Sequence, residues 1–149
     1  MTTPDQQMRP WSPIIGRWRS SGTVFDEAGT AVQAINGTDE YEWMVGGHWV
    51  IHRVDVMMGS DRVQALELIG DHDGGDDSYT MRAFDSSGEF SAMTARRQAD
   101  GSWIFTGDAM RVTLWVADDG SSMTNIWQRR HERSGDWIRW MEMQFERLD

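Results

Sequence analysis

Apolar and polar residues alternate with a period of two along most of the chain. In the segment 111–116, Val112, Leu114 and Val116 fall on one face and the residues between them on the other. Successive side chains of a β-strand point to opposite faces, whereas a helical pattern repeats every 3.6 residues. The pattern therefore predicts strands at 15–25, 31–45, 48–57, 62–71, 78–85, 88–97, 102–107, 109–118, 121–132 and 136–148.

Short turn signals separate these segments at intervals of roughly 10–15 residues. They combine Gly with Asp or Ser, as at 73–76 and 134–136, because such residues accept the backbone angles of tight hairpins. Asn36-Gly37 is ambiguous and predicts either a bulge inside a long strand or a separate hairpin. Residues 5–12 are expected to form a short helix, with Thr3 as its cap and Pro4 in its first turn.

The short connections favour antiparallel pairing of consecutive strands. An open sheet of this size would expose two unpaired edges, and closing it into a barrel removes both edges. We therefore expect residues 1–149 to form one all-β domain, a single antiparallel up-and-down β-barrel of about ten strands. Residues 1–10 are expected to be flexible or part of the short N-terminal helix. A barrel of this size has room for one small ligand.

Composition and charge exclude several classes of function. The chain has no Cys, which excludes a disulfide framework, a thiolate metal site and a thiol nucleophile. All 14 basic residues are Arg and the net charge is −10, so nucleic acid and anionic membranes are poor partners. The lack of Lys excludes Schiff-base chemistry. No long apolar run or signal peptide is visible, so a cytoplasmic location is expected.

Several short motifs together resemble the calycin-like barrels, the broad group of lipocalins, fatty-acid-binding proteins and nitrobindin-like proteins. The motifs are Ile15-Gly16-Arg17-Trp18, Glu40-Tyr41-Glu42-Trp43 followed by Gly46-Gly47, Ile69-Gly70-Asp71, the segment 82–88 and Gly135-Asp136-Trp137. Within this group the chain is most similar to the bacterial DUF1579 family, over roughly residues 10–148. The resemblance implies a calycin-like barrel with a central cavity, and this family carries no agreed function to transfer.

The nitrobindin-like branch of this group binds haem through a histidine. His131 lies late in this chain, beside a predicted hairpin, but the fuller motif of that branch is not visible in residues 16–25. No cofactor is therefore predicted, and haem stays an alternative.

Three residues in the predicted strands are candidates for acid–base chemistry: His52, Glu67 and Tyr41. His48 shares a face with His52 but lies about 13 Å from it along a strand, too far for both to hold one metal ion. The acidic segment 71–77 lacks the spacing of a calcium-binding loop. No metal site is predicted.

The chain is rich in Trp, with nine, and Met, with eleven, and these large side chains can fill a core or line a cavity. An inward Arg could bind a carboxylate through two hydrogen bonds, and an Asn could orient a polar group of a ligand. Periodicity does not show which face of each strand points inward, because both faces carry large apolar residues. The ligand-binding candidates are Trp43, Trp49, Arg82, Phe84, Trp103, Asn125 and Trp127.

Three hypotheses for function follow. The first is a barrel that binds a small apolar or aromatic molecule, which requires a cavity of roughly 300 Å³ or more. The second is a cofactor-free isomerase or cyclase, which burial of His52, Glu67 or Tyr41 beside the cavity would favour. The third is a dimerisation or interaction module that forms a homodimer through exposed Trp residues such as Trp137 or Trp140.

Overall fold

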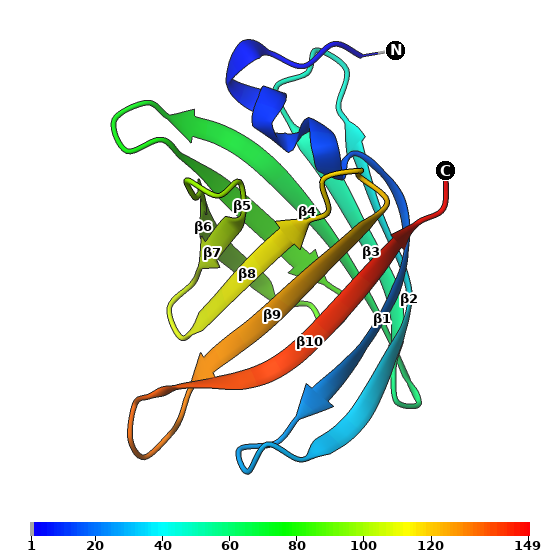
Figure 1. The fold of residues 1–149 in the computed structure, drawn as a ribbon, viewed down its shortest axis with the longest axis vertical. Coiled ribbons are helices and arrows are strands. Elements are labelled where there is room, and N and C mark those ends of the chain that lie inside the picture. Colours follow the sequence, from blue (N-terminus) through cyan, green and yellow to red (C-terminus); the bar gives the residue numbers. More distant parts are fainter. Residues whose placement is uncertain (1) are drawn as a thin grey trace.

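The computed structural model describes residues 2–149, and ten antiparallel strands within them close into one barrel (Figure 1). A 3₁₀ helix, η1 (Gln6–Ile14), precedes the strands. The strands are β1 (Gly16–Phe25), β2 (Ala31–Trp43), β3 (Val50–Met58), β4 (Asp61–Asp73), β5 (Ser78–Asp85), β6 (Phe90–Arg97), β7 (Trp103–Thr106), β8 (Met110–Val116), β9 (Ser122–Arg130) and β10 (Trp137–Arg147).

Each strand pairs with the next one in the chain, and β1 pairs with β10 to close the barrel. Every strand lies within three residues of its predicted bounds, which confirms the predicted fold class. Asn36-Gly37 forms no hairpin, because β2 continues through it and pairs with β1 and β3 on either side. Gly37 is needed for close approach there: a Cβ atom would overlap the Asp55 carbonyl oxygen and lie 2.6 Å from Val56 Cα.

The N-terminal helix is present as predicted but differs in its bounds and its cap. Asp5, not Thr3, is the N-cap, and its carboxylate accepts a hydrogen bond from the backbone N–H of Gln7 at 3.3 Å. Pro10 and Pro13 lie within the helix, and each lacks the N–H that a longer α-helix would need. The short helix predicted at residues 5–12 therefore spans Gln6–Ile14 and is of the 3₁₀ type.

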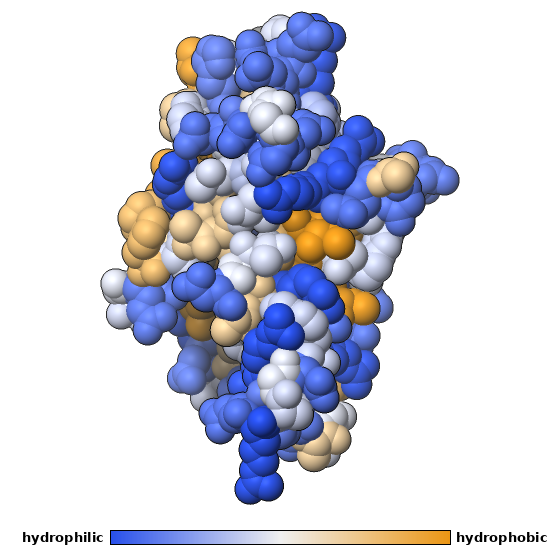
Figure 2. Space-filling view, turned by 90° about the vertical axis from the view of Figure 1, so that its left-hand side faces the viewer, coloured by the Kyte–Doolittle hydropathy of each residue, from blue (hydrophilic) through white to orange (hydrophobic). Residues whose placement is uncertain are grey.

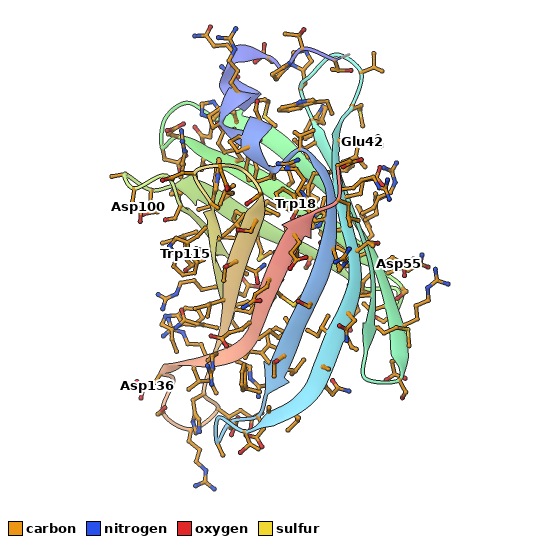
Figure 3. All side chains as sticks on the ribbon, turned by 45° about the vertical axis from the view of Figure 1, so that its right-hand side comes forward. Trp18, Glu42, Asp55, Asp100, Trp115 and Asp136 are labelled. Carbon is orange, nitrogen blue, oxygen red and sulfur yellow. The ribbon has the colours of Figure 1, made fainter. Side chains whose placement is uncertain are left out.

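The helix covers one end of the barrel (Figure 1). Trp11 is fully buried and stacks on Trp103 of β7, with ring centroids 3.9 Å apart. Trp18 of β1, labelled at this end in Figure 3, donates a hydrogen bond from its indole to the Ile14 carbonyl at 2.9 Å. Aromatic packing and this hydrogen bond hold the helix against the strand ends.

The opposite end of the barrel carries only hairpin turns, among them the β9–β10 turn where Asp136 is labelled in Figure 3. Alternate residues of every strand point inward and form the core. On β3 the inward residues include Val50, His52 and Val56, which are buried, whereas Arg53 is exposed. No helix within residues 2–149 is long and apolar enough to span a membrane.

Candidate functional site

A buried histidine lies between two carboxylates on the inner wall of the barrel. His52 on β3 is flanked by Asp39 on β2 and Glu67 on β4, and the three side chains are 7–11% exposed. His52 Nε2 is 2.6 Å from Asp39 Oδ2, and Nδ1 is 3.0 Å from Glu67 Oε1. Both ring nitrogens are within hydrogen-bond distance of a carboxylate, which is the arrangement that holds a doubly protonated imidazolium.

The strand register brings this cluster together. Tyr41 pairs with His52 and His52 pairs with Glu67, so these three side chains form one row across β2, β3 and β4. Asp39 lies two residues before Tyr41 and so shares its inward face. The Tyr41 ring stacks on the imidazole with centroids 3.9 Å apart and planes 12° apart. An aromatic face favours a cation placed over it.

Ser20 of β1 completes the cluster. Its hydroxyl is buried and donates to Asp39 Oδ1 at 2.5 Å, so both oxygens of Asp39 accept hydrogen bonds. Glu67 differs, because its Oε2 atom has no hydrogen-bond partner among residues 2–149. The Tyr41 hydroxyl likewise has none within that range. Glu67 Oε2 and the Tyr41 hydroxyl are therefore the polar atoms of the cluster that could form a hydrogen bond with a ligand.

The surroundings set the charge of the cluster at neutral pH. Burial alone would lower the pKa of His52, but the hydrogen bonds from its ring to Asp39 and Glu67 outweigh burial and raise that pKa from 6.5 to about 9. Burial, with the charges of Asp39 and Glu67, raises the pKa of Tyr41 well above 10. At neutral pH, His52 is therefore a cation held between two carboxylates and Tyr41 is neutral.

A pocket of about 640 Å³ lies near the end of the barrel opposite to the helix η1. We call it the mouth pocket; its lining comprises residues 90–93 of β6, 107–110 at the β7–β8 turn, Arg129 of β9 and Trp140 of β10. It exists because β7 is short: β7 pairs only with Thr94–Arg97, so residues 90–93 of β6 have no partner in β7. This side of the molecule faces the viewer in Figure 2, where apolar surface lies between hydrophilic ends.

Arg129 has an unusual environment in this pocket. It shares the inward face of β9 with Asn125 and pairs with Met110 of β8. Its Nε atom is buried and has no hydrogen-bond partner among the described residues, and its guanidinium carbon is 5.8 Å from the centre of the Trp140 ring. No carboxylate within residues 2–149 forms an ion pair with it. A charged group is thus partly desolvated without a protein anion.

Three ligand-binding candidates lie outside the barrel, contrary to the prediction that they face a cavity. Trp49 packs over Gly70, where a Cβ atom would be 2.5 Å from the Trp49 ring. Arg82 forms an ion pair with Asp71 at 3.0 Å. Phe84 is 48% exposed and lines a depression of about 590 Å³ on the outer face of β2–β5. On β5, Arg82 and Phe84 alternate with the buried Tyr79 and Met81, and Trp49 directly precedes the inward Val50 of β3.

The other four ligand-binding candidates face inward. Trp43 packs against the core, and Trp103 is buried beneath Trp11 of the helix, so the helix fills the space beside Trp103. Asn125 is 8% exposed, and its Oδ1 atom has no hydrogen-bond partner among the described residues. Trp127 is partly buried and lies edge-on to Trp140, with centroids 6.1 Å apart. Trp127 therefore supports the aromatic side of the mouth pocket.

The remaining named candidates stabilise the β9–β10 end. His131 Nδ1 accepts hydrogen bonds from the backbone N–H groups of Arg133 and Ser134, so this nitrogen orders its own turn rather than facing the barrel interior. Trp137 is half-buried between the guanidinium groups of Arg111 and Arg130, at 4.5 and 4.0 Å from its ring centre. This placement leaves less of the Trp137 ring for a partner than the interaction hypothesis expects.

Asp39, Ser20 and Arg129 are absent from the predicted site. Asp39 shares its inward face with Tyr41, and that period-two relation was a usable signal once Tyr41 was known to face inward. Ser20 has no comparable signal, because its partner comes from the register between β1 and β2. Arg129 shares a face with Asn125 and Trp127, so its position was readable from the same alternation.

Comparison with known proteins supports the fold alone. No family model matches the chain, and no curated protein is significantly similar in sequence. The S-type phycobiliprotein lyase CPES from Guillardia theta is 8% identical with a TM-score of 0.66, and the match covers 98% of this chain and 99% of that one. Rv2717c from M. tuberculosis is 11% identical with a TM-score of 0.68, and the match covers 99% and 100%.

This chain is a ten-stranded barrel of the calycin-like type, as these similar structures are. The resemblance to the DUF1579 family stays a prediction, since no family model matches.

Proposed function

We propose that this barrel binds a small apolar or aromatic molecule in the mouth pocket. The observation that carries the proposal is the pocket itself, which at about 640 Å³ falls within the range of roughly 300–1,000 Å³ that small-molecule sites occupy. Its lining combines apolar side chains with three polar ones, Ser91, Asp108 and Arg129, as ligand sites commonly do. The similarity in fold to a structure named as a phycobiliprotein lyase is compatible with such a site.

Native mass spectrometry of the protein purified from its own host tests the proposal. We expect a stoichiometric mass increment over the denatured chain, released on denaturation. Binding of the neutral dye Nile red to the ligand-stripped protein, followed by fluorescence, localises the site. Ala109→Trp places a bulky side chain at the pocket lining and should abolish dye binding, whereas Ala28→Trp makes the same change at an exposed turn outside the pocket. Equal dye binding by both variants would contradict the mouth pocket as the site.

A second candidate function, a cofactor-free isomerase or cyclase, is favoured by one observation. His52, Glu67 and Tyr41 are all buried in one row on the inner wall, although none of the three is among the residues that line the mouth pocket. In this proposal Glu67 Oε2 removes a proton from the substrate, and the His52 imidazolium keeps Glu67 oriented. His52 itself is a poor base, because both nitrogens face carboxylates.

Hydrogen exchange tests this second candidate without a known substrate. The protein is incubated in D₂O with a small-molecule extract of its host, and the metabolites are analysed by mass spectrometry. We expect a metabolite that isomerises or gains carbon-bound deuterium with the wild type but not with Glu67→Gln. Glu42→Gln is the matched control, because Glu42 pairs with Arg53 on the outer face. Identical metabolite profiles with wild type and Glu67→Gln would reject this function.

A further inference from the structure

We propose that the mouth pocket is selective for a monoanionic ligand, an aromatic carboxylate whose carboxylate pairs with Arg129. This inference rests on the proposed binding function and names the ligand class of the same pocket. Among the half-buried arginines of residues 2–149, Arg82 pairs with Asp71, Arg111 donates to Gln128, and Arg147 donates to backbone carbonyls. Arg129 alone donates to no protein oxygen.

The buried Nε–H of Arg129 has no acceptor among the described residues, so it requires a source of compensation. Burying a donor without an acceptor is costly, and the cost is greater for a charged group. The Trp140 ring lies 5.8 Å from the guanidinium carbon and supplies only a weak attraction at that distance. Asp108 lines the same pocket but is exposed and forms no ion pair with Arg129. The anion that would satisfy Arg129 is therefore expected from the ligand.

The charges around the pocket favour a single negative charge on that ligand. Arg129 is the only cationic residue in the lining, and Asp108 is an acidic residue of the same lining. The chain as a whole carries a net charge of −10, which opposes entry of a multiply charged anion such as a phosphate ester. A carboxylate fits the planar fork of one guanidinium through two parallel hydrogen bonds.

The rest of the lining favours an aromatic body. Trp140 offers its ring, and Met93 and Met110 offer thioethers, which make favourable contacts with aromatic rings. Phe90 lines the outer rim, where its ring packs against Phe84 with centroids 5.2 Å apart. Trp127 packs edge-on against Trp140 and holds its ring in place. A ligand that places its ring among these side chains brings a short acidic arm to Arg129.

Isothermal titration of the full chain with matched probes tests the inference. The probes are 2-naphthylacetate, its neutral isostere 2-naphthylacetamide and the cation 2-(2-naphthyl)ethylammonium. A charge-assisted pair in a partly desolvated site predicts that the acetate binds roughly 10- to 100-fold more tightly than the amide. The ammonium probe should bind most weakly. Arg129→Met should remove the preference for the acetate while it leaves the affinity for the amide within about threefold.

Arg130→Met is the matched control, because the adjacent Arg130 is exposed and donates to the Gly135 carbonyl. This variant should keep the preference for the acetate. Arg129→Lys keeps the positive charge but loses the planar guanidinium fork, so it should retain a reduced preference for the acetate. This variant replaces Arg129→Met in the test if circular dichroism shows that Arg129→Met does not fold. Equal affinities of wild type for acetate and amide would overturn the inference and leave the binding function standing. Failure of all probes, together with failure of Nile red to bind, would overturn both.

Discussion

His52 lies directly opposite Glu67 in the β3–β4 ladder, and its Nδ1 atom is 3.0 Å from Glu67 Oε1. The pair lies on the inner wall, so each group depends on the other to offset its loss of water. Asp39 completes the arrangement from the other side of the ring. Polar clusters of this kind are costly when incomplete, so the barrel should be sensitive to the protonation state of His52.

The stability of the barrel should fall as the pH rises from about 6.5 to about 9. The folded-state pKa of His52 is raised to about 9, above its ordinary value of 6.5, so the folded state holds this proton more tightly than the unfolded chain. The contribution is complete below pH 6.5 and is lost by the time the pH passes 9; it amounts to about 3 kcal/mol. Urea unfolding at a series of pH values measures it.

His48→Gln is the control for this pH dependence, because His48 is exposed and outside the cluster. It should leave the pH profile unchanged. A free energy of unfolding that stays level between pH 6.5 and 9 would show that His52 is not protonated in the folded state.

Glu67→Gln should lower the pKa of His52. The amide keeps the shape of the side chain but removes one of two carboxylates, while burial continues to disfavour the cation. We expect the pKa to fall by roughly one pH unit or more. Nitrogen chemical shifts of the imidazole ring, followed by NMR across pH 5–10, report it directly.

The same titration of Glu42→Gln controls for a general change in surface charge, since Glu42 pairs with Arg53 outside the barrel. This variant should titrate at the wild-type pH. If Glu67→Gln did so too, Asp39 alone would be sufficient to hold the proton.

The strands were predictable from the sequence because alternation and turn residues are local signals. β7 and β8 are short, yet the Gly-containing turns on either side define both. The type of the N-terminal helix was not predictable in the same way. It depends on Pro10 and Pro13 and on the burial of Trp11 against Trp103, which is more than 90 residues away.

The sequence could not show which face of each strand points into the barrel. Arg82 and Phe84 carry the same alternation whether they face the core or solvent, and their outward position becomes clear only from the register with β4. His52, Glu67 and Tyr41 were identified as candidates by residue type. The chain of hydrogen bonds from Ser20 through Asp39 and His52 to Glu67 requires the pairing of four strands, β1 to β4. Arg129 could be recognised as a candidate only from the structure, in which its buried Nε atom has no hydrogen-bond partner among the described residues.

Trp11→Ala should destabilise the protein by about 3–5 kcal/mol, the usual cost of deleting a buried Trp side chain. Trp11 is fully buried and contacts Tyr79 and Trp103, so its loss leaves a cavity where the helix covers the barrel. Urea unfolding measures the change. Arg9→Ala, an exposed position in the same helix, should change the stability by less than about 0.5 kcal/mol. A similar small effect for Trp11→Ala would mean that the helix does not contribute to closing this end.

Gly37→Ala should destabilise the barrel and also disturb the His52 cluster. The new methyl group would meet the Asp55 carbonyl and lie 2.6 Å from Val56 Cα, so β2 must move away from β3. Because these contacts are with backbone rather than with a flexible side chain, we expect a cost of about 1–3 kcal/mol. The displacement acts on Asp39, which lies two residues further along β2 and is 2.6 Å from His52 Nε2.

Two measurements on the same samples separate the packing effect from the effect on the cluster. Urea unfolding gives the loss of stability, and NMR titration should show a lower pKa for His52, because a longer distance to Asp39 weakens the hydrogen bond that raises it. Gly74→Ala is the matched control, since a Cβ atom there meets nothing within 4 Å and its φ lies outside the left-handed region. That variant should be close to wild type in both measurements. A destabilised Gly37→Ala with an unchanged His52 pKa would show that β2 yields at Gly37 without moving Asp39.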